Sequence, residues 1–142
     1  MTARRVLDLI FTGALWGGLA VLLGGRAFGR PIWGAALASP VIAVIVGALL
    51  QGRFERQSGS RRIWIALLSL YLGATLFGLA VGIADWPGLT ATGSRPLENL
   101  AEAVLSVWWG VTITGFLLFL WPLAYGTHWM LEWRDSYPPG QR

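Results

Sequence analysis

His128 is the only histidine of the chain and the side chain best suited to hold a metal-centred cofactor. A neutral imidazole can coordinate the iron of a haem or the magnesium of a chlorophyll. Trp121 and Trp129 lie within two helical turns of it, and their flat indole rings could line a pigment or a quinone. These three are therefore the candidate cofactor-binding residues. A haem held by two histidines of this chain alone is excluded by the count.

The residues around His128 leave two interpretations open. Ala124 precedes it by four residues, and this spacing resembles the Ala-x-x-x-His of light-harvesting polypeptides that bind bacteriochlorophyll. Glu132 follows it by four residues, so His128 could instead pair with this carboxylate one helical turn on. The second interpretation is favoured, because two fixed residues at one spacing recur often by chance.

Catalytic chemistry has little support in the sequence. There is no Gly-rich phosphate loop, nucleophile elbow or zinc signature, and the lack of Cys removes thiol chemistry. Charge-coupled transport needs an ionisable residue deep in the membrane. The first apolar run contains only Asp8, close enough to Arg4 and Arg5 to pair with them or to reach the interface. We expect no catalytic residue, no metal site and no enzyme.

The elements that position these residues are expected to be transmembrane helices. Of the 142 residues, 55% are hydrophobic and 13% are charged, against about 25% charged in a soluble domain. Four long apolar runs without the alternating period of barrel strands predict helices. We therefore predict an all-α membrane protein, a compact four-helix bundle forming one domain over residues 1–142. Its helices are expected at roughly residues 6–25, 32–51, 63–84 and 103–131, followed by a flexible tail at 132–142.

Three features of these runs have consequences for topology. The fourth run is longer than a bilayer needs, so it should tilt, kink at Pro122, or extend into the interface. A cleaved signal peptide is the alternative for the first run, with a weak cleavage site near Arg26. With both termini in the cytoplasm, eight arginines lie inside and three outside, which favours that orientation. The inner set is Arg4, Arg5, Arg53, Arg56, Arg61, Arg62, Arg134 and Arg142, and the outer set is Arg26, Arg30 and Arg95.

Small residues recur at intervals of four in every run, which is the pattern of closely packed membrane helices. Because lipid is as apolar as leucine, close backbone approach through small side chains drives association of such helices. We predict that these stripes form the helix contacts. They are Gly13 and Gly17; Ala35, Ser39, Ala43 and Gly47; Ala74, Gly78 and Gly82; and Ser106, Gly110 and Thr114.

Three functions follow as hypotheses, in a multi-pass protein of a bacterial inner membrane. The first is a non-catalytic accessory or scaffolding subunit of a larger membrane complex, with the lipid bilayer and other integral membrane subunits as partners. The second is a subunit that binds pigment, haem or quinone at His128. Nucleic acid is not an expected partner, since the arginines lie between apolar runs. The third is a transporter of small solutes or lipids with a polar path of Ser69, Tyr71, Thr75, Thr112 and Thr114.

Overall fold

The computed structural model describes residues 2–86, 95–117 and 120–137, and within these ranges all regular structure is helical, as predicted. Three of the helices are each long and apolar enough to cross a membrane, and the last two pass that test only as a pair. The helices are therefore those of a multi-pass membrane protein with three or four spans. The helices are α1 (Ala3–Phe28), α2 (Arg30–Arg56), α3 (Ser60–Ala84), α5 (Pro96–Leu117) and α6 (Leu120–Ser136).

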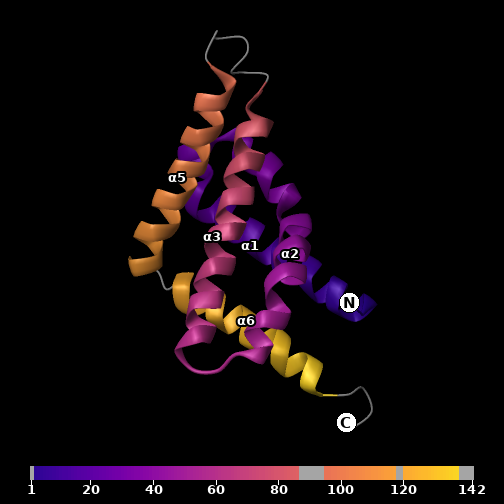
Figure 1. Cartoon of the computed structure of the whole chain (residues 1–142). Coiled ribbons are helices and arrows are strands. Elements are labelled where there is room, and N and C mark those ends of the chain that lie inside the picture. Colours follow the sequence, from indigo (N-terminus) through magenta and orange to yellow (C-terminus); the bar gives the residue numbers. More distant parts are fainter. Residues whose placement is uncertain (1, 87–94, 118–119, 138–142) are drawn as a thin grey trace.

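Two short connections fold α2 back against α1 and α3 back against α2 (Figure 1). Gly29 is the single residue between α1 and α2, and Gly59 is the last residue of the turn between α2 and α3. Both have a φ of 59°, which glycine adopts without the steric penalty of a Cβ atom. α5 then lies alongside α3, and α6 crosses the lower part of the bundle.

The contact between α1 and α2 depends on glycine at position 13. A Cβ atom there would lie 2.5 Å from the Ser39 carbonyl oxygen and 2.6 Å from Pro40 Cα. Gly17 meets the same face, where its Cβ would lie 2.8 Å from the Ala36 carbonyl oxygen. The Ala36 carbonyl accepts no hydrogen bond from position 40 of its own helix, because Pro40 has no N–H. The two helix backbones can therefore approach this closely only because neither glycine has a side chain.

α3 and α5 meet through a second pair of glycines. A Cβ on Gly78 would lie 2.7 Å from Val104 Cα, and one on Gly82 would lie 2.6 Å from a methyl group of Leu100. Gly110, which belongs to the small-residue stripe predicted on α5, does not take part in this contact. Gly110 has no atom within 4 Å of its Cβ position. The α5 residues that approach Gly78 and Gly82 are Leu100, Ala103 and Val104.

The fourth predicted span is not one continuous helix. α5 and α6 are inclined at 90° to each other, with residues 118–119 outside the described ranges. The expected kink at Pro122 does not account for this bend, because Pro122 lies in the first turn of α6, where a helix needs no N–H from it. Within the corner, the Trp121 indole packs against Gly115. A Cβ atom on Gly115 would lie 2.5 Å from the indole nitrogen of Trp121.

The polar segments at both ends of this span also differ from the prediction. α5 begins at Pro96, one to two turns before the predicted residue 103. Glu132 to Ser136, assigned to the flexible tail, continue α6. The remainder of the predicted tail, residues 138–142, lies outside the described residues.

The start of α1, the turn between α2 and α3, and the charged half of α6 lie at one end of the molecule (Figure 1), which we call the ionic end. Ion pairs join α6 to α1 and α3 there, and α1 to α2. They are Arg134 with Asp8 at 2.9 Å, Arg62 with Glu132 at 2.8 Å, and Arg5 with Asp135 at 3.6 Å and with Glu55.

Asp8 was expected either to pair with Arg4 or Arg5 or to reach the interface, and neither of these arginines is its partner. Its partner is Arg134, because α6 folds back across the start of α1 and brings that guanidinium 2.9 Å from the carboxylate. The Asp8 side chain is only 10% exposed and that of Arg134 is 48% exposed. The pair therefore combines a buried charge with a solvated one.

Reversing the charge of Asp8 should weaken the attachment of α6 to α1. We expect Asp8→Arg to lower the free energy of unfolding by about 1–2 kcal/mol, because two cations would then face each other at a partly buried site. The double variant Asp8→Arg/Arg134→Asp should recover most of that loss. Unfolding in mixed micelles measures both, and a double variant no more stable than the single one would contradict the pairing.

Candidate functional site

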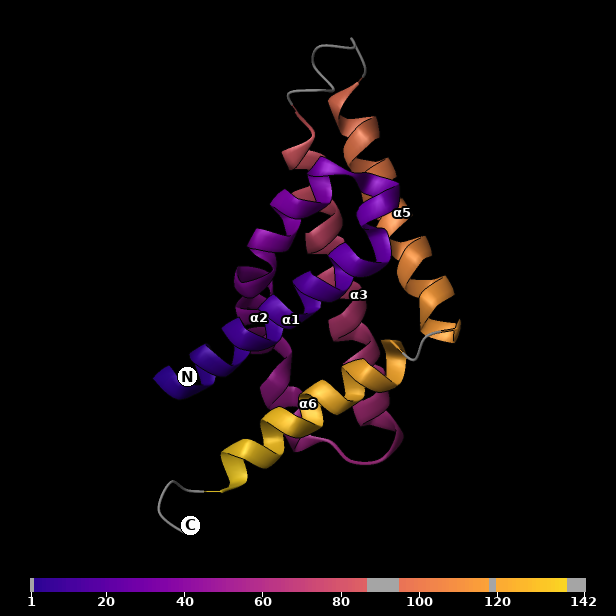
Figure 2. The ribbon, with the colours of Figure 1, turned by 180° about the vertical axis from the view of Figure 1, so that it is seen from behind.

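A crevice with a volume of about 500 Å³ lies among all five described helices. Seen from behind, α1 and α6 cross in front of α3, and α5 stands at its side (Figure 2). Apolar side chains, including alanine and Trp16 as well as leucine, valine, isoleucine and phenylalanine, form most of the walls, and small residues of α1, α2, α3 and α5 leave the space between them. Among the described residues that line it, none is Asp, Glu, Arg or Lys. The crevice is thus an uncharged, apolar site within a membrane protein.

Three polar side chains from three helices meet at the wall of this crevice, and we call them the polar trio: Gln51, Ser69 and His128. Ser69 Oγ lies 2.6 Å from His128 Nε2, and Gln51 Oε1 is bonded to His128 Nδ1. The Gln51 amide also donates to the His128 carbonyl oxygen at 3.3 Å. The solvent-exposed fraction is 1% for Gln51, 6% for His128 and 8% for Ser69. The trio is a buried, mutually satisfied network.

The bonds of Gln51 determine the tautomer of the imidazole. Because the Gln51 NH₂ group donates to the His128 carbonyl, its oxygen must face Nδ1, and Nδ1 must carry a proton. A neutral ring then accepts at Nε2 from the Ser69 hydroxyl, which also lies 2.7 Å from the Ala66 carbonyl oxygen. Both ring nitrogens are therefore engaged. A metal could bind His128 only after one of these hydrogen bonds had broken.

The Ser69–His128 pair has the atoms of a nucleophile and base, but not their usual surroundings. Ser69 lies within α3, so its own backbone N–H and those of its neighbours are used in the helix. An acyl-transfer site needs such donors free to stabilise an oxyanion. This geometry supports a hydrogen-bonding role for Ser69, not an attacking one.

Phe54 connects the polar trio to the ionic end. Its ring is fully buried and stacks on the His128 ring, with centroids 4.7 Å apart and planes 19° apart. The Arg62 guanidinium lies 5.2 Å from the centroid of the same ring, and the Tyr125 ring packs against it in a T-shaped arrangement. The orientation of His128 is thus set by packing as well as by hydrogen bonds.

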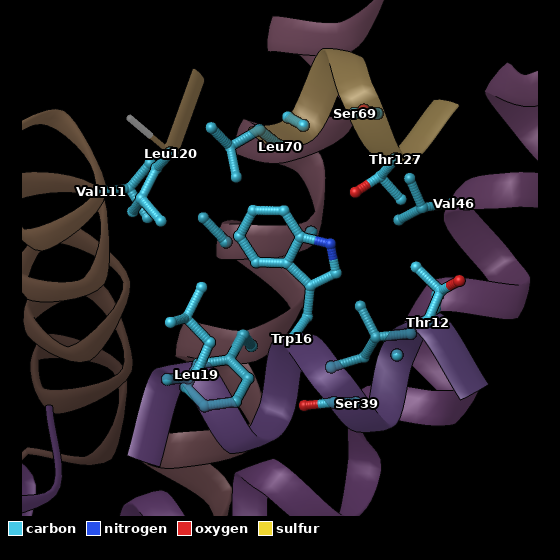
Figure 3. A pocket seen from close by; sticks show the side chains of 18 of the residues that line it. Thr12, Trp16, Leu19, Ser39, Val46, Ser69, Leu70, Val111, Leu120 and Thr127 are labelled. Atoms are coloured by element: carbon cyan, nitrogen blue, oxygen red, sulfur yellow. The ribbon is translucent and has the colours of Figure 1, made fainter. Parts of the chain in front are cut away.

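Trp16 projects into the middle of the crevice (Figure 3). Its indole nitrogen is turned toward the side where Thr127 and Val46 lie. Within the described part of the chain it donates to no other residue, whereas the Trp108 nitrogen donates to Thr75 Oγ1 at 3.0 Å. Since an indole N–H can only donate, Trp16 offers a donor to an oxygen atom that enters the crevice.

The three candidate cofactor-binding residues are not brought together. His128 lies at the crevice, but Trp129, its neighbour in sequence, is 54% exposed on the other side of α6. Trp121 is packed in the corner between α5 and α6 and is not among the residues that line the crevice. The preferred pairing of His128 with Glu132 is wrong, because Glu132 pairs with Arg62 while His128 lies on the buried face of α6.

The residues of the hypothetical transport path lie at two separate places. Ser69 and Thr114 line the crevice. Tyr71, Thr75 and Thr112 form a cluster between α3 and α5, where Tyr71 Oη lies 2.9 Å from Thr112 Oγ1. The five residues therefore do not line a common path.

Gln51 is the member of the polar trio that the sequence analysis did not identify. It is the first polar residue after the second apolar run, a position that normally marks the end of a span. The structure shows why this position is internal. α2 continues past Gln51 to Arg56, so the Gln51 side chain lies inside the protein and not in the headgroup region.

No family model, no curated protein and no solved structure matches this chain. The fold and the crevice define it as a helical, multi-pass membrane protein with an uncharged internal site.

Proposed function

We propose that this protein is a non-catalytic membrane protein that binds a neutral, lipid-soluble molecule in the crevice, with a quinone as the best-fitting class. The observation that carries the proposal is a 500 Å³ apolar crevice whose described lining has no charged side chain. Sites for small molecules commonly measure about 300–1,000 Å³, with apolar walls and a few placed polar groups. The polar trio and Trp16 are those polar groups.

The lining supports a neutral ligand over a charged one. A carboxylate or phosphate inside the crevice would lack a counter-charge, and burying an unpaired charge is costly. A carbonyl oxygen needs only a donor, which the Trp16 N–H provides. A quinone head with an isoprenoid chain meets both conditions. Haem and chlorophyll fit less well, because both nitrogens of His128 are already bonded.

Filling the crevice should remove the ligand without unfolding the protein. Gly110 lines the crevice with no atom within 4 Å of its Cβ position. We expect Gly110→Phe to lower the amount of quinone extracted from the purified protein by about tenfold or more, because the ring would occupy the ligand's space. Solvent extraction followed by chromatography measures it. Binding of a short-chain benzoquinone to protein in nanodiscs gives the affinity.

Gly18→Phe is the matched control. Gly18 is exposed, has no atom within 4 Å of its Cβ position and is not among the residues that line the crevice. This variant should retain the ligand. A wild-type protein without quinone that also fails to bind the benzoquinone would refute the proposal, and so would retention of quinone by Gly110→Phe.

An accessory subunit of a larger membrane complex is the competing proposal. What supports it is that Gly73 and Gly110 line the crevice with nothing near their Cβ positions, and membrane helices associate through such small residues. The same variants distinguish the two functions. A membrane polypeptide that elutes in stoichiometric amount with the wild type and Gly18→Phe, but not with Gly110→Phe, would favour the accessory role.

We also propose that the ionic end faces the cytoplasm of a bacterium, with both chain termini there. The support is the distribution of arginine. At this end the start of α1, the end of α2, the start of α3 and α6 together carry most of the arginines, and short cytoplasmic segments are enriched in such residues.

A further inference from the structure

A groove lies at the turn between α2 and α3, and we call it the arginine groove. α2 ends with Arg53 and Arg56, and α3 begins at Ser60, so a three-residue turn brings Arg61 beside them. The residues that line the groove are Arg53, Arg56, Gln57, Arg61, Trp64 and Ile65.

Among the described residues, the three arginines of the groove form no ion pair with an Asp or Glu. The ion pairs of the described residues use Arg5, Arg62, Arg95 and Arg134, and no Asp or Glu lines the groove. Arg62, the next residue along α3, shows the contrast: it bonds Glu132 and lies against Phe54. Three exposed guanidinium groups thus leave an uncompensated positive charge at one place.

The other wall of the groove is apolar. Trp64 is 70% exposed and lies at the start of a span. At this position an indole ring prefers the headgroup level of a bilayer. Ile65 follows it along the apolar part of α3. Gly59, the residue before α3, has no side chain that could accept hydrogen bonds from the first N–H groups of the helix. These N–H groups of the first turn of α3 therefore add to the positive potential. The groove is therefore cationic toward water and apolar toward lipid.

We propose that the arginine groove binds the phosphate-bearing headgroup of an anionic phospholipid. Arginine binds phosphate oxygens through paired N–H groups. Arg53, Arg56 and Arg61 would bind the phosphate, while Trp64 and Ile65 contact the glycerol and upper acyl chains. Phosphate is the shared chemistry of lipid and soluble ligands, and the apolar wall favours the lipid. This site is separate from the crevice and does not depend on the function proposed for it.

Lipid selectivity of the full chain in bilayers tests the proposal. Spin-labelled phosphatidylglycerol and phosphatidylcholine are compared in phosphatidylcholine vesicles that contain the protein, and the motionally restricted fraction gives their relative association constants. We expect the wild type to prefer phosphatidylglycerol and Arg53→Gln/Arg61→Gln to lower that preference by roughly tenfold, since each arginine near the surface adds attraction for anionic lipid. Arg53→Lys/Arg61→Lys should keep most of it, because lysine still binds phosphate as a point charge.

The matched control removes two arginines from the opposite end. Arg26 and Arg30 are exposed and, among the described residues, take part in no ion pair. Arg26→Gln/Arg30→Gln should leave the selectivity unchanged. An equal loss in this variant, or no loss in Arg53→Gln/Arg61→Gln, would overturn the proposal. Displacement of labelled phosphatidylglycerol by excess inorganic phosphate at constant ionic strength would also overturn it, by assigning the groove to a soluble phosphate.

Discussion

Replacing Gly13 by alanine is expected to push α1 away from α2 and to lower the free energy of unfolding by about 3 kcal/mol. The new Cβ would lie 2.5 Å from the Ser39 carbonyl oxygen and 2.6 Å from Pro40 Cα. These are backbone atoms within a helix, so they cannot rotate away as a flexible side chain would. The helix itself must shift, and contacts along the α1–α2 interface are lost. Unfolding in mixed micelles, followed by circular dichroism, measures the change.

Gly18→Ala, in the same helix, is the control for this prediction. No atom lies within 4 Å of the Cβ position of Gly18, and alanine is the better helix former, so stability should stay equal or rise slightly. Gly78→Ala should repeat the loss at the α3–α5 contact, where the Cβ would lie 2.7 Å from Val104 Cα. Equal stability of Gly13→Ala and Gly18→Ala would show that the close approach of α1 and α2 is not essential.

Hydropathy predicts the first three helices well, because a membrane-crossing segment must be both apolar and helical. It predicts their ends less well. α2 runs to Arg56, beyond the predicted residue 51, since its last turn contains residues that form helices readily and buries Phe54 inside the protein. The apolar run marks where lipid ends, whereas the helix ends where Gln57 leaves the helical conformation.

The fourth span shows what hydropathy does not measure. Its apolar run is continuous in sequence, but α5 and α6 lie at 90° to each other. Nothing in the average apolarity of a segment specifies its direction. The feature that accompanies the bend is the Trp121 ring against Gly115, and this contact between residues six apart is visible only in three dimensions.

The candidate site was predicted only in part, because its residues are far apart in sequence. His128 was chosen as the only histidine, but its partners Gln51 and Ser69 lie 77 and 59 residues before it. Reasoning from helical spacing sees only neighbours such as Glu132. That residue faces Arg62, because the buried face of α6 carries Ala124, His128 and Leu131.

Removing His128 should cost about 1–3 kcal/mol of stability, and most of that cost should disappear when Gln51 is removed as well. His128→Phe keeps a ring that can stack on Phe54, but it leaves the Gln51 oxygen buried without its donor. Ser69 still has the Ala66 carbonyl oxygen as acceptor. Gln51→Leu leaves the His128 Nδ1–H unpaired and should cost a similar amount. The four proteins form a double-mutant cycle, measured by unfolding in mixed micelles.

The cycle distinguishes a structural trio from one kept for ligand binding. A double variant His128→Phe/Gln51→Leu that is more stable than either single variant means that the hydrogen bonds mainly satisfy each other, since replacing both buried partners by apolar groups can be nearly neutral. If that stable variant also loses the quinone, the trio is present for the ligand, because the fold does not require it. Additive losses of stability would contradict the pairing of Gln51 with His128.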